Sequence, residues 1–225
     1  MRRQQFQVGE YYHIFNRGVE SRQIFVDDYD YIRFLRGMRE FNRLEAIGSI
    51  YEKDYQSKKV GQVQEAKPPI GGLASTPLVE LMCYSLVLNH YHFILKPLEE
   101  KGIERFMHKL GTSFTMYFNQ KYNRSGALFQ GPYKSIHIRT DGNLFRLSAY
   151  INANIEVHKI TRAEKWPWSS YQDYIGKRNG SLSNKKMILD HFKNVSEYKE
   201  FVVIVIKEFQ DVKEEIIIFK NDNGK

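Results

Sequence analysis

Two histidines separated by a single residue, His90 and His92, are the side chains of this sequence best suited to chemistry. The apolar stretch 81–96 around them is rich in β-branched and aromatic residues, which predicts two buried strands and a turn near Asn89. Residues two apart in a strand share a face, so both imidazoles project together and Tyr91 faces the other way. Neutral imidazoles placed in this way bind divalent metals, although an isolated pair is more often structural.

A second polar group lies on a predicted helix at about 144–159, which a Thr-Asp-Gly-Asn cap precedes. Tyr150, Asn154 and His158 are four residues apart and therefore form one stripe, beside an apolar stripe of the same helix. A tyrosine and an amide one turn apart become informative only if their stripe faces the two histidines.

The remaining pattern mixes short strands with long amphipathic helices. We expect strands at 11–18 and 127–138, helices at 28–42 and 103–122, and an aromatic turn at 166–171 that packs a helix end onto a sheet. The segment 51–77 is dominated by Lys, Gln, Gly and Pro, which indicates a surface loop or disordered insertion. We divide the chain into a domain at 1–176 and a helical C-terminal tail at 177–225, whose last apolar run is β-prone.

The bulk composition fits one globular cytoplasmic protein. The chain has 225 residues, 42% of them hydrophobic and 27% charged, with neither a membrane-spanning apolar run nor an apolar signal core after the N-terminus. The single cysteine, Cys83, lies in a strand pattern and is expected to be a small core residue.

The charge balance favours a polyanionic partner. The net charge is +8 and the pI is about 9.3, which suits nucleic acid, although many basic proteins bind no polyanion. Lys109, Lys121 and Arg124 are among the polar residues of the second long helix, which ends near 122–126, and they form either a phosphate-contacting face or simply a solvated one. On the strand at 127–138, Lys134 could approach a phosphate, whereas His137 is expected to be an ordinary strand histidine rather than a further ligand.

Six short motifs occur in a recognisable order, at 12–18, 24–28, 89–95, 122–131, 149–154 and 166–171. Together they resemble the single-tyrosine HUH transposases of the insertion-sequence type, and within these the REP-associated tyrosine transposases. The resemblance covers about 11–171. Two positions differ from the family pattern, since Ile155 and Leu88 stand where the family usually or often has proline.

The resemblance implies an α+β fold, an antiparallel sheet flanked by helices in a ferredoxin-like or RRM-like arrangement. By position, His90 and His92 would be the metal-binding pair, Asn154 would supply a third ligand, and Tyr150 would be the nucleophile. The implied cofactor is a divalent ion, Mg²⁺ or Mn²⁺. The expected DNA-binding residues are Arg17, Lys109, Lys121, Arg124 and Lys134.

The implied activity is cleavage and rejoining of single-stranded DNA at hairpins, through a 5′-phosphotyrosine that conserves bond energy and needs no ATP. Members of the family act as monomers or homodimers, so the tyrosine could act in its own chain or in a partner. Two alternatives remain open. One is a DNA-binding regulator on the same scaffold without strand transfer, and the other is a metal-dependent hydrolase, which would need further His, Asp or Glu ligands.

Overall fold

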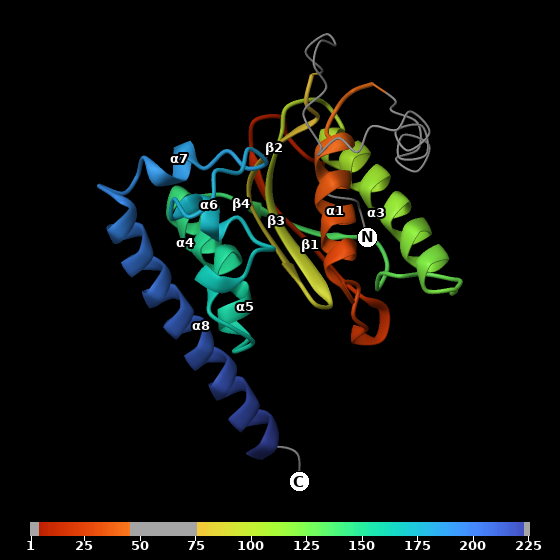
Figure 1. The fold of residues 1–225 in the computed structure, drawn as a ribbon. Helices are drawn as coiled ribbons and strands as arrows, with labels where there is room; N and C mark the ends of the chain where they lie inside the picture. The colour runs from red at the N-terminus through yellow and green to blue at the C-terminus, as the bar shows by residue number, and fades with distance from the viewer. Residues whose placement is uncertain (1–4, 46–75, 223–225) are drawn as a thin grey trace.

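The computed structural model describes residues 5–45 and 76–222, with side chains as far as Val212. Most of the predicted insertion at 51–77 therefore lies outside the described residues. Four antiparallel strands form one sheet in the order β2-β3-β1-β4 (Figure 1). The strands are β1 (Tyr11–Arg17), β2 (Val79–Val87), β3 (His90–Pro97) and β4 (Lys134–Ile138).

Helices cover both faces of this sheet (Figure 1). The α-helices are α1 (Asp28–Glu40), α3 (Gly102–Lys121), α4 (Asp141–Asn152), α5 (Asn154–Val157), α6 (Tyr171–Tyr174), α7 (Lys186–Leu189) and α8 (Val195–Asp222), and the 3₁₀ turns are η1 (Val19–Ser21) and η2 (Ala163–Lys165). The order β1-α1-β2-β3-α3-β4, with β1 and β3 central, is the ferredoxin-like arrangement expected from the sequence. Within the described residues, no helix is both long and apolar enough to cross a bilayer.

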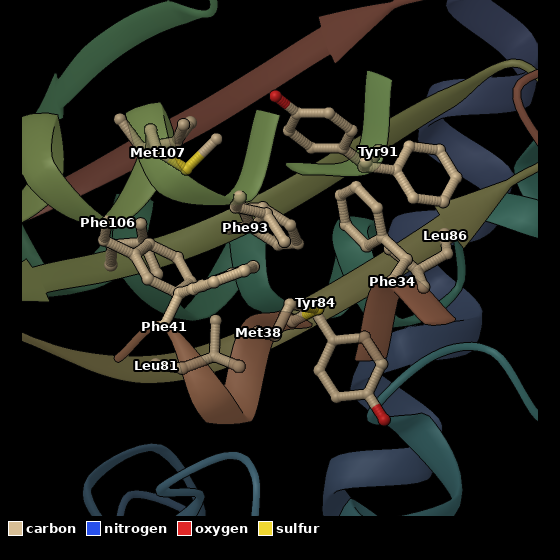
Figure 2. Packing of buried hydrophobic residues seen from close by; sticks show 14 of the residues in the cluster. Phe34, Met38, Phe41, Leu81, Tyr84, Leu86, Tyr91, Phe93, Phe106 and Met107 are labelled. Atoms are coloured by element: carbon tan, nitrogen blue, oxygen red, sulfur yellow. The ribbon is translucent and has the colours of Figure 1, made fainter. Parts of the chain in front are cut away.

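One face of the sheet packs against α1 and α3. Alternate residues of β3, including Tyr91 and Phe93, point into this core and meet Phe34 from α1 and Phe106 from α3 (Figure 2). Each such side chain contributes about 1.5–3 kcal/mol when fully buried. Because Tyr91 lies between the two histidines, its burial here directs both imidazoles to the opposite face.

The opposite face packs against α4, α5 and α8. Its core contains Cys83 and Ile94 from the sheet together with Tyr198, Val202 and Val205 from α8. Cys83 is a buried, free thiol, as predicted. The apolar run at 216–219 continues the backbone of α8 as helix rather than strand.

The predicted helix at 144–159 is interrupted, which corrects the expectation of one continuous helix. α4 ends at Asn152, and Ala153 leaves helical geometry with φ −100° and ψ 12° before α5 begins. The side chain of Asn152 is buried, where it donates to the hydroxyl of Tyr198 at 2.8 Å and accepts from that of Ser170 at 2.6 Å. The spacing of apolar residues along the sequence gives no information about such tertiary contacts.

The strand predicted at 127–138 is also shorter, because only Lys134–Ile138 pairs as β4. Gly131 has a φ of +109°, outside the strand region, and Pro132 has no N–H to donate to a ladder. Phe129, before this break, makes an isolated bridge with Gly18.

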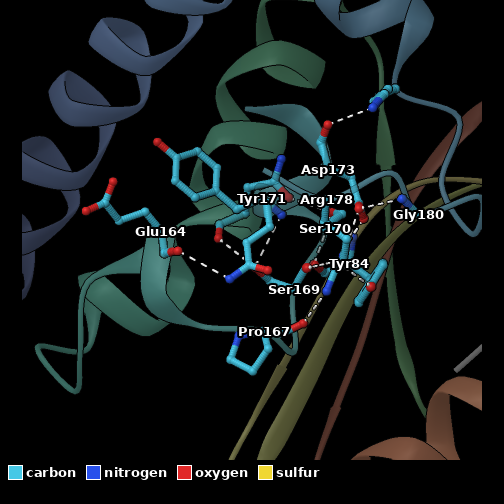
Figure 3. A network of polar contacts seen from close by, with 12 residues as sticks. Tyr84, Glu164, Pro167, Ser169, Ser170, Tyr171, Asp173, Arg178 and Gly180 are labelled. Carbon is cyan, nitrogen blue, oxygen red and sulfur yellow. Dashed lines mark hydrogen bonds and ion pairs between the residues drawn. The ribbon is translucent and has the colours of Figure 1, made fainter. Parts of the chain in front are cut away.

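The aromatic turn at 166–171 closes the outer edge of β2. The backbone N–H of Leu86 donates to Trp168, and that of Ser170 donates to Tyr84. The guanidinium of Arg178 donates to the carbonyls of Pro167 and Ser169 in the turn, and it also pairs with the carboxylate of Asp173 at 2.7 Å (Figure 3). Pairing of this kind protects an edge strand and fixes the sheet that carries the two histidines.

Candidate active site

His90 and His92 project from one face of β3, toward α4 and α5. Their ring centroids are 5.1 Å apart with the ring planes nearly perpendicular. β3 is hydrogen-bonded on both sides, to β2 and to β1, so the backbone that carries the pair is held firmly. The sequence prediction that the two imidazoles share a face agrees with this geometry.

His90 is oriented by two asparagines. Asn89 donates its amide N–H to the carbonyl of Ser21 at 3.1 Å, so its Oδ1 accepts from Nδ1 of His90 at 2.7 Å. In a neutral ring, Nε2 of His90 is then an acceptor, and it faces Oδ1 of Asn154 at 3.0 Å. Two acceptor atoms that face each other in this way are suited to share a cation.

The spacing of these two atoms fits a metal ion. An octahedral ion with ligands at about 2.1 Å places neighbouring ligand atoms about 3.0 Å apart, the separation found here. The donors are two imidazoles and one amide oxygen, from His90, His92 and Asn154, a mixed set that divalent ions accept. The residues present therefore fit the implied Mg²⁺ or Mn²⁺.

His92 is oriented by His13 on the neighbouring strand β1. Nε2 of His13 lies 2.9 Å from Nδ1 of His92, and the two rings stack at 5.1 Å. Burial lowers the pKa of His13 to about 4, so the His13 ring is neutral near pH 7. With Nδ1 engaged, Nε2 is the atom through which His92 would bind a metal.

Tyr150 lies beside this group in the same chain. Its ring centroid is 6.0 Å from that of His92, and its ring packs at 4.4 Å on Phe209 of α8. Burial raises the pKa of Tyr150, while an interaction with the amide of Asn154 lowers it in part. The break at Ala153 separates the two residues, yet both reach the histidine face.

A pocket of about 650 Å³ opens next to the histidines. Two of the expected DNA-contacting cations, Arg17 and Lys134, belong to its wall, and so does His158. The full lining is Phe15, Asn16, Arg17, Ser21, Gln23, Val87, Leu88, Asn89, His90, His92, Gln130, Lys134, His158 and Ile160.

The other three expected cations are not among the pocket residues. Nζ of Lys121 pairs at 2.7 Å with carboxylates of Asp27 and of the buried Asp30. This pairing raises the pKa of the Lys121 ammonium and ties α3 to the first turn of α1.

Lys109 and Arg124 are also engaged in local structure. Lys109 donates to the carbonyl of Arg43 at 3.1 Å, and Arg124 bonds the side chain of Asn119. His137 contacts Glu10 at 3.0 Å and is not a pocket residue either.

Sequence reasoning missed two residues of this site, His13 and Phe15. The signal for both was the alternation of β1, which places His13, Phe15 and Arg17 on one face. The pairing of β1 with β3, which carries that face to the two histidines, became visible only in the sheet. In the part of the chain that the structure describes, no three His, Cys, Asp or Glu side chains gather as a metal site.

Comparison with known proteins supports the fold. Neither a protein-family model nor a curated protein matches this sequence. Among solved structures, a REP-associated tyrosine transposase bound to a REP hairpin superposes with a TM-score of 0.51 at 14% identity, over 82% of this chain and 89% of that one. The chain therefore has the α+β fold of that transposase, a four-stranded antiparallel sheet flanked by helices.

Proposed function

We propose that this protein is a metal-dependent transposase or endonuclease that cleaves and rejoins single-stranded DNA at hairpins. The observation that carries the proposal is the meeting, within one chain, of Tyr150 with His90, His92 and Asn154 beside a cationic pocket. The hairpin-bound transposase of similar fold supports DNA as the substrate.

The chemistry is an in-line displacement at phosphorus. The phenolic oxygen of Tyr150 forms a bond to the scissile phosphorus and loses its proton to solvent, while the 3′-oxygen of the preceding nucleotide leaves and is protonated. The products are a 5′-phosphotyrosine and a free 3′-hydroxyl, and rejoining is the reverse displacement. A divalent ion bound by the two imidazoles and the amide would polarise the phosphate and offset its developing charge.

The surroundings of Tyr150 position its oxygen more than they activate it. Because burial raises its pKa, the hydroxyl remains protonated near neutral pH and is a weak nucleophile on its own. The amide of Asn154 lies close enough to the hydroxyl to affect its pKa, and we expect Arg17 and Lys134 in the pocket wall to hold the phosphate, so that attack depends on alignment.

A DNA-binding regulator without strand transfer is the second candidate. The packing of Phe209 against Tyr150 favours it, because a tyrosine held under an α8 side chain could serve the core alone. The two candidates predict the same DNA binding and differ in covalent chemistry.

A covalent-adduct experiment distinguishes them. The protein is incubated with hairpin-containing single-stranded DNA and Mg²⁺ or Mn²⁺, and we expect an adduct that survives denaturation. Tyr150→Phe should abolish cleavage and adduct together while keeping the fold and DNA affinity, since it removes one oxygen and keeps the ring.

Tyr117→Phe is the matched control, because its hydroxyl bonds Asp30 on the α1 and α3 side of the sheet. This variant should still form the adduct. Binding without an adduct would support the regulator, cleavage without an adduct would support a hydrolase, and an adduct that maps to another tyrosine would exclude Tyr150 as nucleophile.

A further inference from the structure

A row of three different side chains crosses the pocket face of the sheet. The register pairs Phe15 of β1 with His92 of β3 on one side and with Lys134 of β4 on the other. Directly paired residues of antiparallel strands share a face, and neighbouring strands lie about 4.8 Å apart. A candidate metal ligand, an aromatic ring and a cation therefore stand in sequence across the pocket wall.

The ring of Phe15 is held in place by two imidazoles. It stacks on His13 at 4.7 Å and on His92 at 5.7 Å, with interplanar angles of 26° and 22°. Phe15 contributes to the pocket lining, whereas His13 does not, so the ring stands between the buried imidazole and the pocket. Its β1 neighbours Tyr12 and Ile14, on the other face, are only 1% and 0% exposed.

A flat apolar ring between a candidate metal ligand and a cation matches the chemistry of a nucleotide, which has a flat base beside charged phosphates. Aromatic rings beside cations are the usual platform for unpaired bases, since every base offers a flat face for stacking. Arg17, paired with His90 in the next row, adds a second cation to the same wall. A phenylalanine that served only to fill the hydrophobic core would not need cations beside it.

We propose that Phe15 stacks on the unpaired base next to the scissile phosphate, while Lys134 contacts the following phosphate of the same strand. The proposal rests on the proposed function, because it takes His90 and His92 as the place where the phosphate is held. It assigns to this chain a subsite for a nucleobase, and makes Phe15 a residue that positions the strand for cleavage.

The test uses Tyr150→Phe protein, which cannot cleave, and hairpin oligonucleotides with 2-aminopurine at each successive position of the single-stranded flank. Stacking quenches this base analogue, so one position should be quenched strongly on binding. Adding Phe15→Leu should remove that quenching and weaken affinity about 5- to 100-fold, whereas Phe15→Trp should retain both. Melting curves of the variants establish that they remain folded.

Tyr29→Leu is the matched control, because Tyr29 is an aromatic residue, 74% exposed, near the cation Lys121 but away from the pocket. It should change neither quenching nor affinity. Unchanged quenching and affinity in Phe15→Leu would refute the base subsite. An adduct formed by the protein that keeps Tyr150 would still support the proposed function. Phe15-dependent quenching by a protein that never forms an adduct would instead retain the subsite and remove the nuclease activity. A protein that binds none of the oligonucleotides would refute both.

Discussion

At the level of single residues, the contact between His13 and His92 sets which nitrogen His92 offers to a metal. We expect His13→Phe to keep a ring against Phe15 but to weaken Mn²⁺ binding about 10- to 100-fold, the range found when residues that orient metal ligands are changed. Isothermal titration calorimetry of the DNA-free protein measures this effect without reference to activity.

His137→Phe is the control for that substitution, since His137 is another strand histidine but contacts Glu10 and Tyr12 instead of the site. It should leave Mn²⁺ affinity unchanged. Equal affinity in the His13 variant and the original protein would show that His13 packs beside the site without orienting it.

Residue-level prediction from the sequence succeeded where a motif is local. His90 and His92 share a strand, and strand periodicity alone places them on one face. His13 and Phe15 belong to the site through the pairing of β1 with β3, whose residues are 79 apart at the histidine contact. No local pattern contains that pairing, which is why these two residues were overlooked.

At the level of elements, the position of Tyr150 depends on the polar contacts at the end of α4. Asn152→Ala would leave the buried hydroxyls of Tyr198 and Ser170 without their amide partner. We expect a loss of about 1–3 kcal/mol in the free energy of unfolding, measured by urea titration. Adduct formation should fall as well, because Asn152 fixes the chain between Tyr150 and Asn154.

Asn143→Ala tests whether that effect is specific, since Asn143 lies in the first turn of the same helix but is exposed. Its effect on unfolding should remain within about 0.5 kcal/mol. A similar loss in both variants would mean that the cluster around Asn152 has no special role.

Element boundaries were predictable where the local chemistry is strong. The helix predicted at 28–42 begins where expected, at Asp28, because the side chain of Asp27 caps it by accepting from the backbone N–H of Asp30, and it ends two residues before the predicted end. The break at Ala153 was missed because the apolar stripe continues through it, with Ile151 and Ile155 both buried. Two consecutive helices that bury the same side produce the same apolar spacing in the sequence as one continuous helix.

At the level of the whole molecule, the net charge of +8 suggests more cations for a polyanion than the fold leaves facing the pocket. Lys121 is committed to Asp27 and Asp30, whereas Arg17 and Lys134 stand in the pocket wall. Composition counts all these cations equally, and only the fold separates those that join helices from those that face the pocket.

Salt dependence should reveal this division. Lys134→Ala should weaken single-stranded DNA binding and reduce the slope of log K against log salt concentration by about 0.7, the value for one phosphate contact on a single strand. Lys109→Ala removes an equal charge outside the pocket and should leave the slope unchanged. The reverse pattern, measured by fluorescence anisotropy, would place the DNA on α3 instead.

The presence of Tyr150 beside the histidines of its own chain also limits how many strand breaks one molecule can hold. Under the proposed chemistry, its single oxygen stays occupied from the first cut until a 3′-hydroxyl displaces it. Releasing a DNA segment requires two cuts, so one molecule must finish the first exchange before it begins the second, or two molecules must each hold one end. Counting adducts per protein molecule during the reaction would show which order is followed, and the ratio should never exceed one.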